Sequence, residues 1–318
     1  MDASVDPQLL RDAYCWEPVD SVPGRPRMTA FRRRLRYHQA QWRQANGHPI
    51  GSQPISPRDG GEPARPLGSR IPLDYARRTG ANFVTTGALD AVRARLARKE
   101  RHQMLFEQRL WADLLSSMPM CFNLFGELAA DHELADQSVR AWWPDVPGTV
   151  VDVRLEHSPG RRNPEYLGNG SAFDVALVLQ LDDAEQAVIG IETKYHECIK
   201  ADVSHPDRLP RYLEVAATSG VFKPGAVDAI EGTELHQIWL DHLLVLSMLQ
   251  HPSGTWRWGR FVLVYPAGNE DFADACARYR ELLTDDATFS YLTIEDLLEA
   301  GALPESTSST LRDRYLPR

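Results

Sequence analysis

Apolar residues recur every three to four positions through residues 87–118 and again through 121–143, which is the period of an amphipathic helix. The first stretch is followed by Pro119 and the second by Pro144. The pattern therefore predicts one long helix that ends at Pro119 and a second helix that stops at Pro144.

The pattern then changes to the alternation and short apolar runs of β-strands. Residues 148–157 alternate, and the apolar runs 172–181 and 186–197 are separated by the short acidic turn "DDAE", which predicts an antiparallel hairpin. Further on, the pattern predicts helices over 208–220 and 234–251, a strand over 260–269, a helix over 270–283 and a C-terminal tail. The order of elements is helix, three strands, helix, strand, helix.

Residues 1–85 differ from the rest of the chain in being rich in Pro, Gly and Arg. We expect an N-terminal basic arm over 1–85 and a folded domain over 86–318. The stretch "MTAFRRRLRYHQAQWRQA" predicts one helix in the arm, and its run of arginines without an acid comprises Arg32, Arg33, Arg34 and Arg36. Such a run indicates either a contact surface for nucleic-acid phosphates or a solvated helix face.

Composition narrows the class of protein. A chain of 318 residues that is 43% hydrophobic can bury a full core, and its net charge of −9 means that any contact with phosphates has to be local. The four cysteines form no C-x-x-C pair, which argues against a zinc cluster and a disulfide framework. We find neither a signal-peptide pattern nor an apolar run that could span a bilayer, so we expect a cytoplasmic protein without membrane contact.

Two opposite charges close the second strand of the predicted hairpin. Glu192 and Lys194 are two residues apart, so in a strand they project from the same face. Asp174 on the preceding strand can share that face, although the register is left open. Two carboxylates without thiols suit Mg²⁺, with Mn²⁺ as a substitute, and the lysine would orient the attacking water or neutralise developing charge. Only 4 of the 35 Lys and Arg residues are lysine, which favours a specific need for an ammonium group at 194.

These residues carry a resemblance to a known family. Asp174, followed on the next strand by Glu192-x-Lys194, resembles the D…(D/E)-x-K signature of the PD-(D/E)XK nuclease superfamily, with Phe173 where the family name has proline. The order of elements over residues 90–270 resembles the superfamily's restriction-endonuclease-like core. The segments "SAFDVAL" and "GIETKYHE" are similar to bacterial proteins assigned as restriction endonucleases.

The resemblance implies an α/β fold with a central mixed sheet flanked by helices, to which the arm and extra helices are added. It also implies that Asp174 and Glu192 bind Mg²⁺, that the carbonyl of Thr193 is a further ligand and that Lys194 is the catalytic lysine. The protein would be a metal-dependent endonuclease, a hydrolase that cuts DNA in restriction or phage defence. The alternative is a catalytically silent nucleic-acid-binding or assembly protein on the same fold. The choice between DNA and RNA, and between a homodimer and a member of a larger defence system, stays open.

Other residues could complete such a site. The superfamily often adds an acid from the first helix and a glutamine from a helix after the E-x-K strand, and the strand before the hairpin ends in an acid and a histidine. For each, the alternative is an ordinary exposed or packed side chain. The expected supporting residues are Glu107, Glu156, His157 and Gln237, with Arg161 and Arg162 as loop residues that could bind a phosphate.

Overall fold

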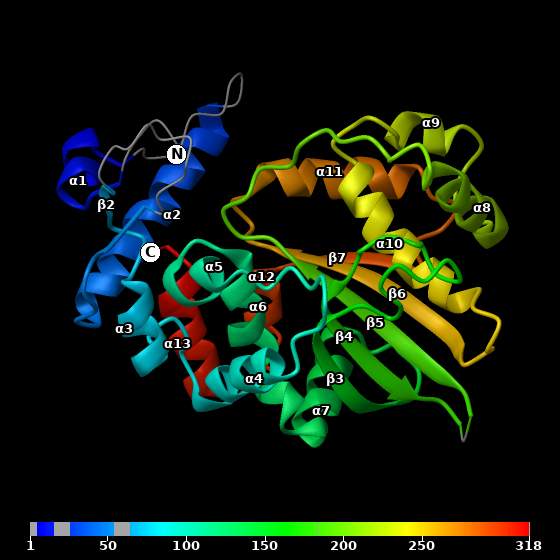
Figure 1. The fold of residues 1–318 in the computed structure, drawn as a ribbon, viewed down its shortest axis with the longest axis horizontal. Coiled ribbons are helices and arrows are strands. Elements are labelled where there is room, and N and C mark those ends of the chain that lie inside the picture. Colours follow the sequence, from blue (N-terminus) through cyan, green and yellow to red (C-terminus); the bar gives the residue numbers. More distant parts are fainter. Residues whose placement is uncertain (1–4, 16–25, 54–63, 183, 318) are drawn as a thin grey trace.

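A five-stranded mixed sheet forms the centre of the computed structural model, which describes residues 5–15, 26–53, 64–182 and 184–317. The strands lie in chain order across the sheet (Figure 1). The first three are antiparallel and the last three are parallel. They are β3 (Thr149–His157), β4 (Phe173–Gln180), β5 (Gln186–Thr193), β6 (Trp256–Tyr265) and β7 (Phe289–Thr293).

Four helices cover one face of the sheet (Figure 1). They pack on alternate strand positions such as Ala176, Val188 and Phe261, which share a hydrophobic core with them. The longest of the four, α10, lies on β5 and β6 and so brings its side chains to the end of β5. The helices are α8 (Leu209–Ser219), α9 (Ala226–Ile230), α10 (His236–Leu249) and α11 (Glu270–Glu281).

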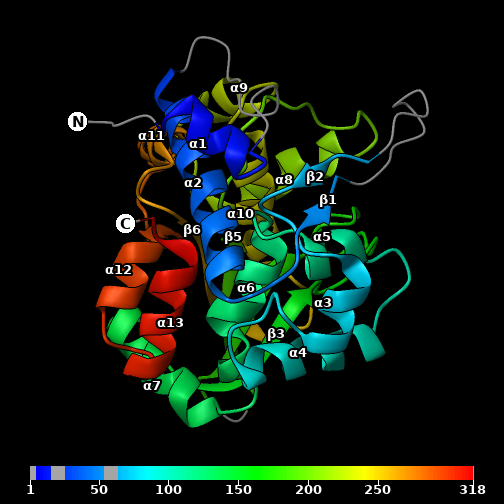
Figure 2. The same cartoon turned by 90° about the vertical axis from the view of Figure 1, so that its left-hand side faces the viewer.

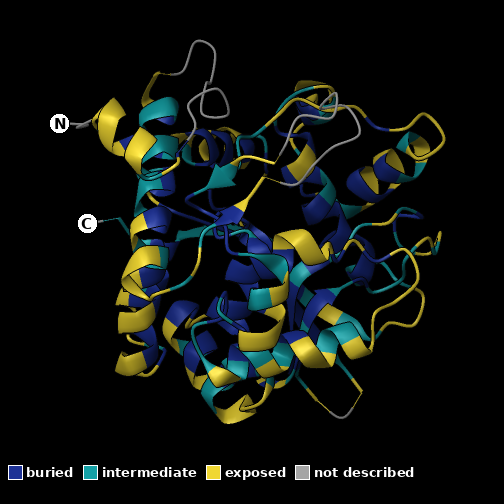
Figure 3. Cartoon of the chain, turned by 60° about the vertical axis from the view of Figure 1, so that its left-hand side comes forward, coloured by how far each residue is buried: buried dark blue, intermediate teal, exposed yellow. Residues whose placement is uncertain are grey.

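The larger core lies against the opposite face. The intervening strand positions, among them Val175, Leu177 and Ile189, point to this side, as the two-residue period requires. The helices turn their buried surfaces inward and their exposed surfaces to solvent (Figure 3). This side includes α2 (Pro26–Ala45), α4 (Thr86–Ala97), α5 (Glu107–Ala112), α6 (Ser117–Phe125), α7 (His132–Trp142), α12 (Ile294–Glu299) and α13 (Glu305–Tyr315).

Small elements complete the described chain. They are α1 (Pro7–Asp12), α3 (Leu73–Thr79), a 3₁₀ turn (Glu127–Ala129) and the two-stranded pair β1 (Gly51–Ser52) and β2 (Pro66–Leu67). No helix in the described ranges combines the length and the apolar character needed to cross a bilayer. The predicted α/β fold with a helix-flanked mixed sheet is confirmed, and the three strands and the antiparallel hairpin are present as β3, β4 and β5.

The single long helix predicted over residues 87–118 is wrong. The chain forms α4 and α5 and only then begins α6, and His102 between them has a φ of +67°. In one continuous helix Leu105 and Leu110 would lie about 140° apart, whereas both are buried in the same core. Pro119 does not end a helix either. It lies in the first turn of α6. N–H groups in the first turn have no hydrogen-bond partner within the helix, so a proline is tolerated there.

The predicted C-terminal tail is also wrong, because the last residues form β7, α12 and α13. α13 packs beside α2 (Figure 2), and α2 buries Phe31 and Leu35 in the larger core. The sequence placed α2 in an N-terminal arm. The division of the chain at residue 85 stays a prediction, which a truncation would test.

Candidate active site

Three acidic residues lie next to one another where the antiparallel strands end. The β3–β4 ladder sets Glu156 opposite Asp174, because the residues on either side of them are paired. The β4–β5 ladder, continued by one residue beyond Val175 and Ile191, sets Asp174 opposite Glu192. We call Glu156, Asp174 and Glu192 the carboxylate row. It brings together side chains from three strands, at cross-strand distances at which charges interact.

Glu156, the second-last residue of β3, has an unusual backbone conformation. Its φ is +51°, in the left-handed region, which costs a residue with a Cβ roughly 1–2 kcal/mol. Such strained residues are concentrated at functional sites. The carbonyl of Glu156 accepts hydrogen bonds from Nε2 of Gln103 at 3.0 Å and from Arg95 at 3.4 Å, and these bonds hold the end of the strand.

Glu192 and Lys194 project from the same face of β5 and form an ion pair. Nζ of Lys194 donates to Oε1 of Glu192 at 2.7 Å, and the amide of Gln237 on α10 donates to the same oxygen at 3.3 Å. The two charged side chains are only 10% and 14% exposed, so this is not a surface ion pair. The N–H of Lys194 donates to the carbonyl of Val264 at 2.8 Å, which extends the ladder with β6 beyond the end of β5.

Asp174 is oriented by Thr193. Its Oδ2 accepts hydrogen bonds from the N–H of Thr193 at 2.8 Å and from the hydroxyl at 2.5 Å. The neighbouring ring of Phe173 lies over Gly190, where a Cβ would be 2.4 Å from the ring. A side chain at 190 would therefore displace the ring of Phe173, the residue that precedes Asp174 on β4.

The crowding of the carboxylates changes their pKa values. Burial, followed by the charge of Glu192, raises the pKa of Glu156 to about 7, and burial with the charges of Glu192 and Glu156 raises the pKa of Asp174. Burial alone would lower the pKa of Lys194, but the charges of Glu192 and Asp241 outweigh it and raise the pKa above its usual value. Lys194 is therefore an ammonium ion at neutral pH and acts through charge and hydrogen bonds.

The oxygens of the row fit a hard divalent cation. Hydrogen bonds engage Oδ2 of Asp174 and Oε1 of Glu192, whereas Oδ1 and Oε2 have no hydrogen-bond partner among the described residues. Asp241 on α10 adds a buried Oδ2 that also lacks such a partner in this part of the chain. Mg²⁺ or Mn²⁺ would bind these unused oxygens and reduce the repulsion between the carboxylates.

The side chains would have to move to take up such a cation. Within the described ranges, no three His, Cys, Asp or Glu residues are gathered closely enough to hold a metal ion as they stand. The contacts that would have to adjust are few, because the carboxylate of Asp174 is held by Thr193 alone and that of Glu192 by Lys194 and Gln237.

Comparison with known proteins identifies the family. The chain matches the PD-(D/E)XK nuclease superfamily over residues 26–317, which is nearly its whole length. The chain belongs to the PD-(D/E)XK nuclease superfamily. The resemblance read from Asp174, Glu192 and Lys194 is thereby confirmed at the level of the family. Members of this superfamily are mostly nucleases, typically with divalent metals. No curated protein and no solved structure was found to match the chain.

In this superfamily member the predicted supporting residues divide into two groups. Glu156 is part of the carboxylate row, Gln237 donates a hydrogen bond to Glu192 of the row, and His157 lies beside Glu156 on β3. Burial, with a smaller effect of Arg154, lowers the pKa of His157 to about 4, so its ring is neutral at pH 7. Glu107 lies elsewhere. The break in the predicted long helix places it at the start of α5, where it is 47% exposed and pairs with a surface arginine.

The loop arginines also differ from each other. Arg161 donates to the carbonyl of Gly170 at 2.9 Å and lies 3.6 Å from Glu100, and its charge acts on Glu156. Arg162 adopts a left-handed turn conformation with a φ of +62°. Arg161 is thus the loop arginine that the structure ties electrostatically to the row.

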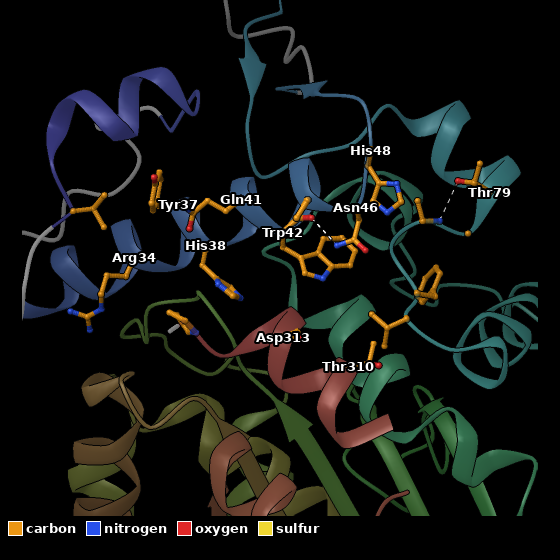
Figure 4. A pocket seen from close by; sticks show the side chains of 17 residues that line it. Arg34, Tyr37, His38, Gln41, Trp42, Asn46, His48, Thr79, Thr310 and Asp313 are labelled. Carbon is orange, nitrogen blue, oxygen red and sulfur yellow. Dashed lines mark hydrogen bonds between the residues drawn. The ribbon is translucent and has the colours of Figure 1, made fainter. Parts of the chain in front are cut away.

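The arginine run of α2 does not form one face. Arg34 lines a cavity of about 1,090 Å³ beside α2, α3 and α13, together with Tyr37 and Trp42 (Figure 4). Arg36 lines a different cavity of about 590 Å³. Two helical positions turn a side chain through about 200°, which explains why the two arginines point into different cavities.

Asp241 and Glu197 were not predicted from the sequence. Asp241 follows Gln237 by four residues on a mostly apolar helix, so both lie on one face, and that spacing was a usable signal. Glu197 accepts hydrogen bonds from the N–H of Ser117 at 3.2 Å and from its hydroxyl at 2.8 Å. No sequence pattern links positions 117 and 197, because this contact arises only when α6 packs against β5.

Proposed function

We propose that the protein is a metal-dependent nuclease that hydrolyses phosphodiester bonds of DNA, with Asp174, Glu192 and Lys194 as its catalytic residues. The observation that carries the proposal is the carboxylate row across three neighbouring strands, with Lys194 hydrogen-bonded to its last member. The match to the nuclease superfamily supports the same activity.

Each residue of the site has a role in this proposal. Bound Mg²⁺ would polarise a phosphoryl oxygen and acidify a bound water. Asp174 and Glu192 supply oxygen ligands for it, with the carbonyl of Thr193 as a further one. Lys194, as an ammonium ion, orients the attacking water and stabilises the negative charge that develops on the phosphate. Gln237 holds Glu192 in place through its hydrogen bond.

The substrate and setting follow from the resemblance to restriction endonucleases. The proposed substrate is DNA. The proposed setting is restriction or phage defence in the cytoplasm. The proposed assembly is a homodimer or a larger defence complex. Six arginines are proposed to contact the nucleic acid through their charge. They are Arg32, Arg33, Arg34, Arg36, Arg161 and Arg162.

The first test is cleavage by the purified protein. Linear, circular and single-stranded DNA, and RNA, are incubated with Mg²⁺ or Mn²⁺ and separately with EDTA. We expect metal-dependent cleavage that falls about 10²–10⁴-fold in Lys194→Ala, the range typical of losing a positioned group that acts on the reacting atoms. Lys194→Arg should fail nearly as badly, because a guanidinium is bulkier than the ammonium that fits against Glu192.

A matched control separates catalysis from folding. Lys223 is an exposed lysine that donates to the carbonyl of Glu281 at 2.7 Å, so Lys223→Ala should cleave like the wild type. Melting temperatures of all variants are measured alongside the single-turnover rates. Near wild-type cleavage by Lys194→Arg would contradict the role given to Lys194. Binding of DNA without cleavage under any metal condition would favour the catalytically silent alternative.

A further inference from the structure

A cavity with a basic lining lies against His196 and Glu197, shortly after Lys194 in the chain. Its volume of about 590 Å³ is within the range of sites that bind small ligands or parts of larger ones. Its described lining includes two acids, Asp113 and Glu197, and four arginines, Arg36, Arg65, Arg70 and Arg109. These residues therefore carry two more positive than negative charges, in a protein whose net charge is −9. We call this the basic cavity.

Two lining residues connect the basic cavity to the proposed catalytic centre. Oε2 of Glu197 accepts a hydrogen bond at 2.8 Å from the N–H of Tyr195, the residue that follows Lys194. Arg109 lies 3.6 Å from Glu197, and its charge also acts on Glu156 in the carboxylate row. A ligand in the cavity would thus lie next to the row.

Both acids of the lining are already engaged within the protein. Asp113 accepts a hydrogen bond from Arg70 at 2.9 Å, and Glu197 accepts hydrogen bonds from Ser117 and from the N–H of Tyr195. Nε of Arg70 is buried without a hydrogen-bond partner among the described residues. Arg109 is 45% exposed and has only the long contact to Glu197 as an ion pair in the described structure. Arg70 and Arg109 therefore keep guanidinium N–H groups that can donate to an anion.

The lining also indicates which part of a nucleic acid would enter. The cavity in Figure 4 has aromatic walls formed by Tyr37, Trp42 and Phe83, which suit flat apolar groups. In the described lining of the basic cavity, His196 is the only ring, and most of the remaining side chains are guanidinium, hydroxyl or amide groups. Guanidinium groups bind phosphate through paired, charge-assisted hydrogen bonds.

We propose that the basic cavity binds a phosphate group of the substrate strand adjacent to the phosphate that is cut. The inference rests on the proposed nuclease function and adds to it a substrate contact made by Arg36, Arg65, Arg70 and Arg109. By holding one phosphate, these residues set the register of the strand, so that the neighbouring phosphodiester reaches the carboxylate row. Arg36 is thus the residue of the arginine run on α2 that we assign to this phosphate contact. The other three arginines of the contact lie outside the run.

The test uses variants of the two exposed arginines, since the buried ones could disturb folding. Arg65→Gln/Arg109→Gln is compared with the wild type and with Arg257→Gln/Arg278→Gln. The control removes the same charge from side chains that are 60% and 51% exposed on β6 and α11. Binding of a fluorescent DNA duplex is measured with Ca²⁺ in place of Mg²⁺ across a range of salt concentrations, and melting temperatures verify that each variant is folded.

We expect the cavity variant to bind more weakly and to lower the steepness of the log–log salt dependence by about 0.9 for each lost contact, while the control keeps the wild-type slope. In a second measurement, each phosphate near the cut is replaced in turn by an uncharged methylphosphonate. At one position next to the cut, the methylphosphonate should weaken DNA binding by the wild type. It should have little effect on DNA binding by the cavity variant, because the methylphosphonate and the Arg→Gln changes remove the same contact.

Three outcomes would overturn the inference. In the first, the wild type binds and cleaves DNA, and the cavity variant shows the same salt-dependence slope and the same response to each methylphosphonate. The second is equal weakening of the control variant, which would mean a general charge effect. The third is a wild type that neither binds nor cleaves any nucleic acid, which removes the proposed function itself and is thereby distinguished from the first two.

Discussion

Glu156 shows how strongly its surroundings act on a single carboxyl group of the row. Its pKa is about 7, compared with an ordinary value of 4.5, because burial and the charge of Glu192 disfavour the ionised form. Between these two values the folded state binds more protons than the unfolded state. The metal-free protein should therefore lose stability as the pH rises through this window, and the raised pKa of Asp174 acts in the same direction.

We expect this loss to appear in thermal unfolding. With EDTA present, the melting temperature should be lower at about pH 8 than at about pH 5.5, by the equivalent of ~2 kcal/mol if Glu156 dominates. Glu156→Gln should remove most of the difference. Mn²⁺ should raise the melting temperature more at the higher pH, because its carboxylate ligands must be deprotonated.

The exposed Glu107 provides the matched control for this measurement. Its carboxylate pairs with Arg77 away from the row, so Glu107→Gln should keep the wild-type response to pH and to Mn²⁺. If Mn²⁺ stabilises the wild type no more than an Asp174→Ala/Glu192→Ala variant, the row does not bind the metal.

At the scale of the strands, Gly190 makes room for the ring of Phe173 at the start of β4. The ring of Phe173 occupies the space that a Cβ at 190 would take, and Phe173 is only 1% exposed, so the ring has little room to move. Gly190→Ala should therefore destabilise the fold by about 1–3 kcal/mol, as overpacking of a core does. It should also reduce cleavage, because Asp174 directly follows Phe173.

Gly170 is the matched control in this case. It has open space around its Cβ position and no positive φ, so Gly170→Ala should leave the free energy of unfolding nearly unchanged. Urea titrations of both variants measure the two effects. Equal stability of Gly190→Ala and Gly170→Ala would contradict the proposed close contact.

At the scale of the whole molecule, a buried arginine near the C-terminus joins distant parts of the chain. Arg314 is 0% exposed and donates to Oδ1 of Asn82 at 3.0 Å and to Oε1 of Gln39 on α2. Its guanidinium also lies 4.3 Å from the ring centre of Trp42. Gln39 in turn donates to the hydroxyl of Tyr195 at 2.7 Å, next to Lys194. Residues from distant parts of the chain thus support the end of β5, next to the lysine that we propose to be catalytic.

Removing this side chain should affect stability and activity together. We expect Arg314→Met to lower the free energy of unfolding by roughly 3 kcal/mol or more, because it breaks a buried hydrogen-bond network and leaves its polar partners unpaired. Arg312→Met on the same helix should cost less, since that side chain is 38% exposed. Urea unfolding followed by tryptophan fluorescence compares the two, and a similar small cost for both would contradict the supporting role of Arg314.

The hairpin and the shared face of Glu192 and Lys194 could be predicted from the sequence, because a two-residue period and a short turn are local properties of the chain. The match to the superfamily signature added Asp174. The pairing of Asp174 with Glu192 was left open by the sequence, since a change of one residue in register would have turned Asp174 to the other face.

Other features could not be read from local patterns, because they arise from contacts between residues far apart in the chain. The chain does not form the long predicted helix, because burial of both Leu105 and Leu110 in one core stabilises the fold more than a continuous helix would. Asp241 reached the carboxylate row because α10 packs on β5, and the basic cavity formed where Arg36 and Arg109 from separate helices meet the residues after Lys194. Spacing along the chain thus specified which residues could carry the chemistry, whereas packing between elements specified which of them lie together.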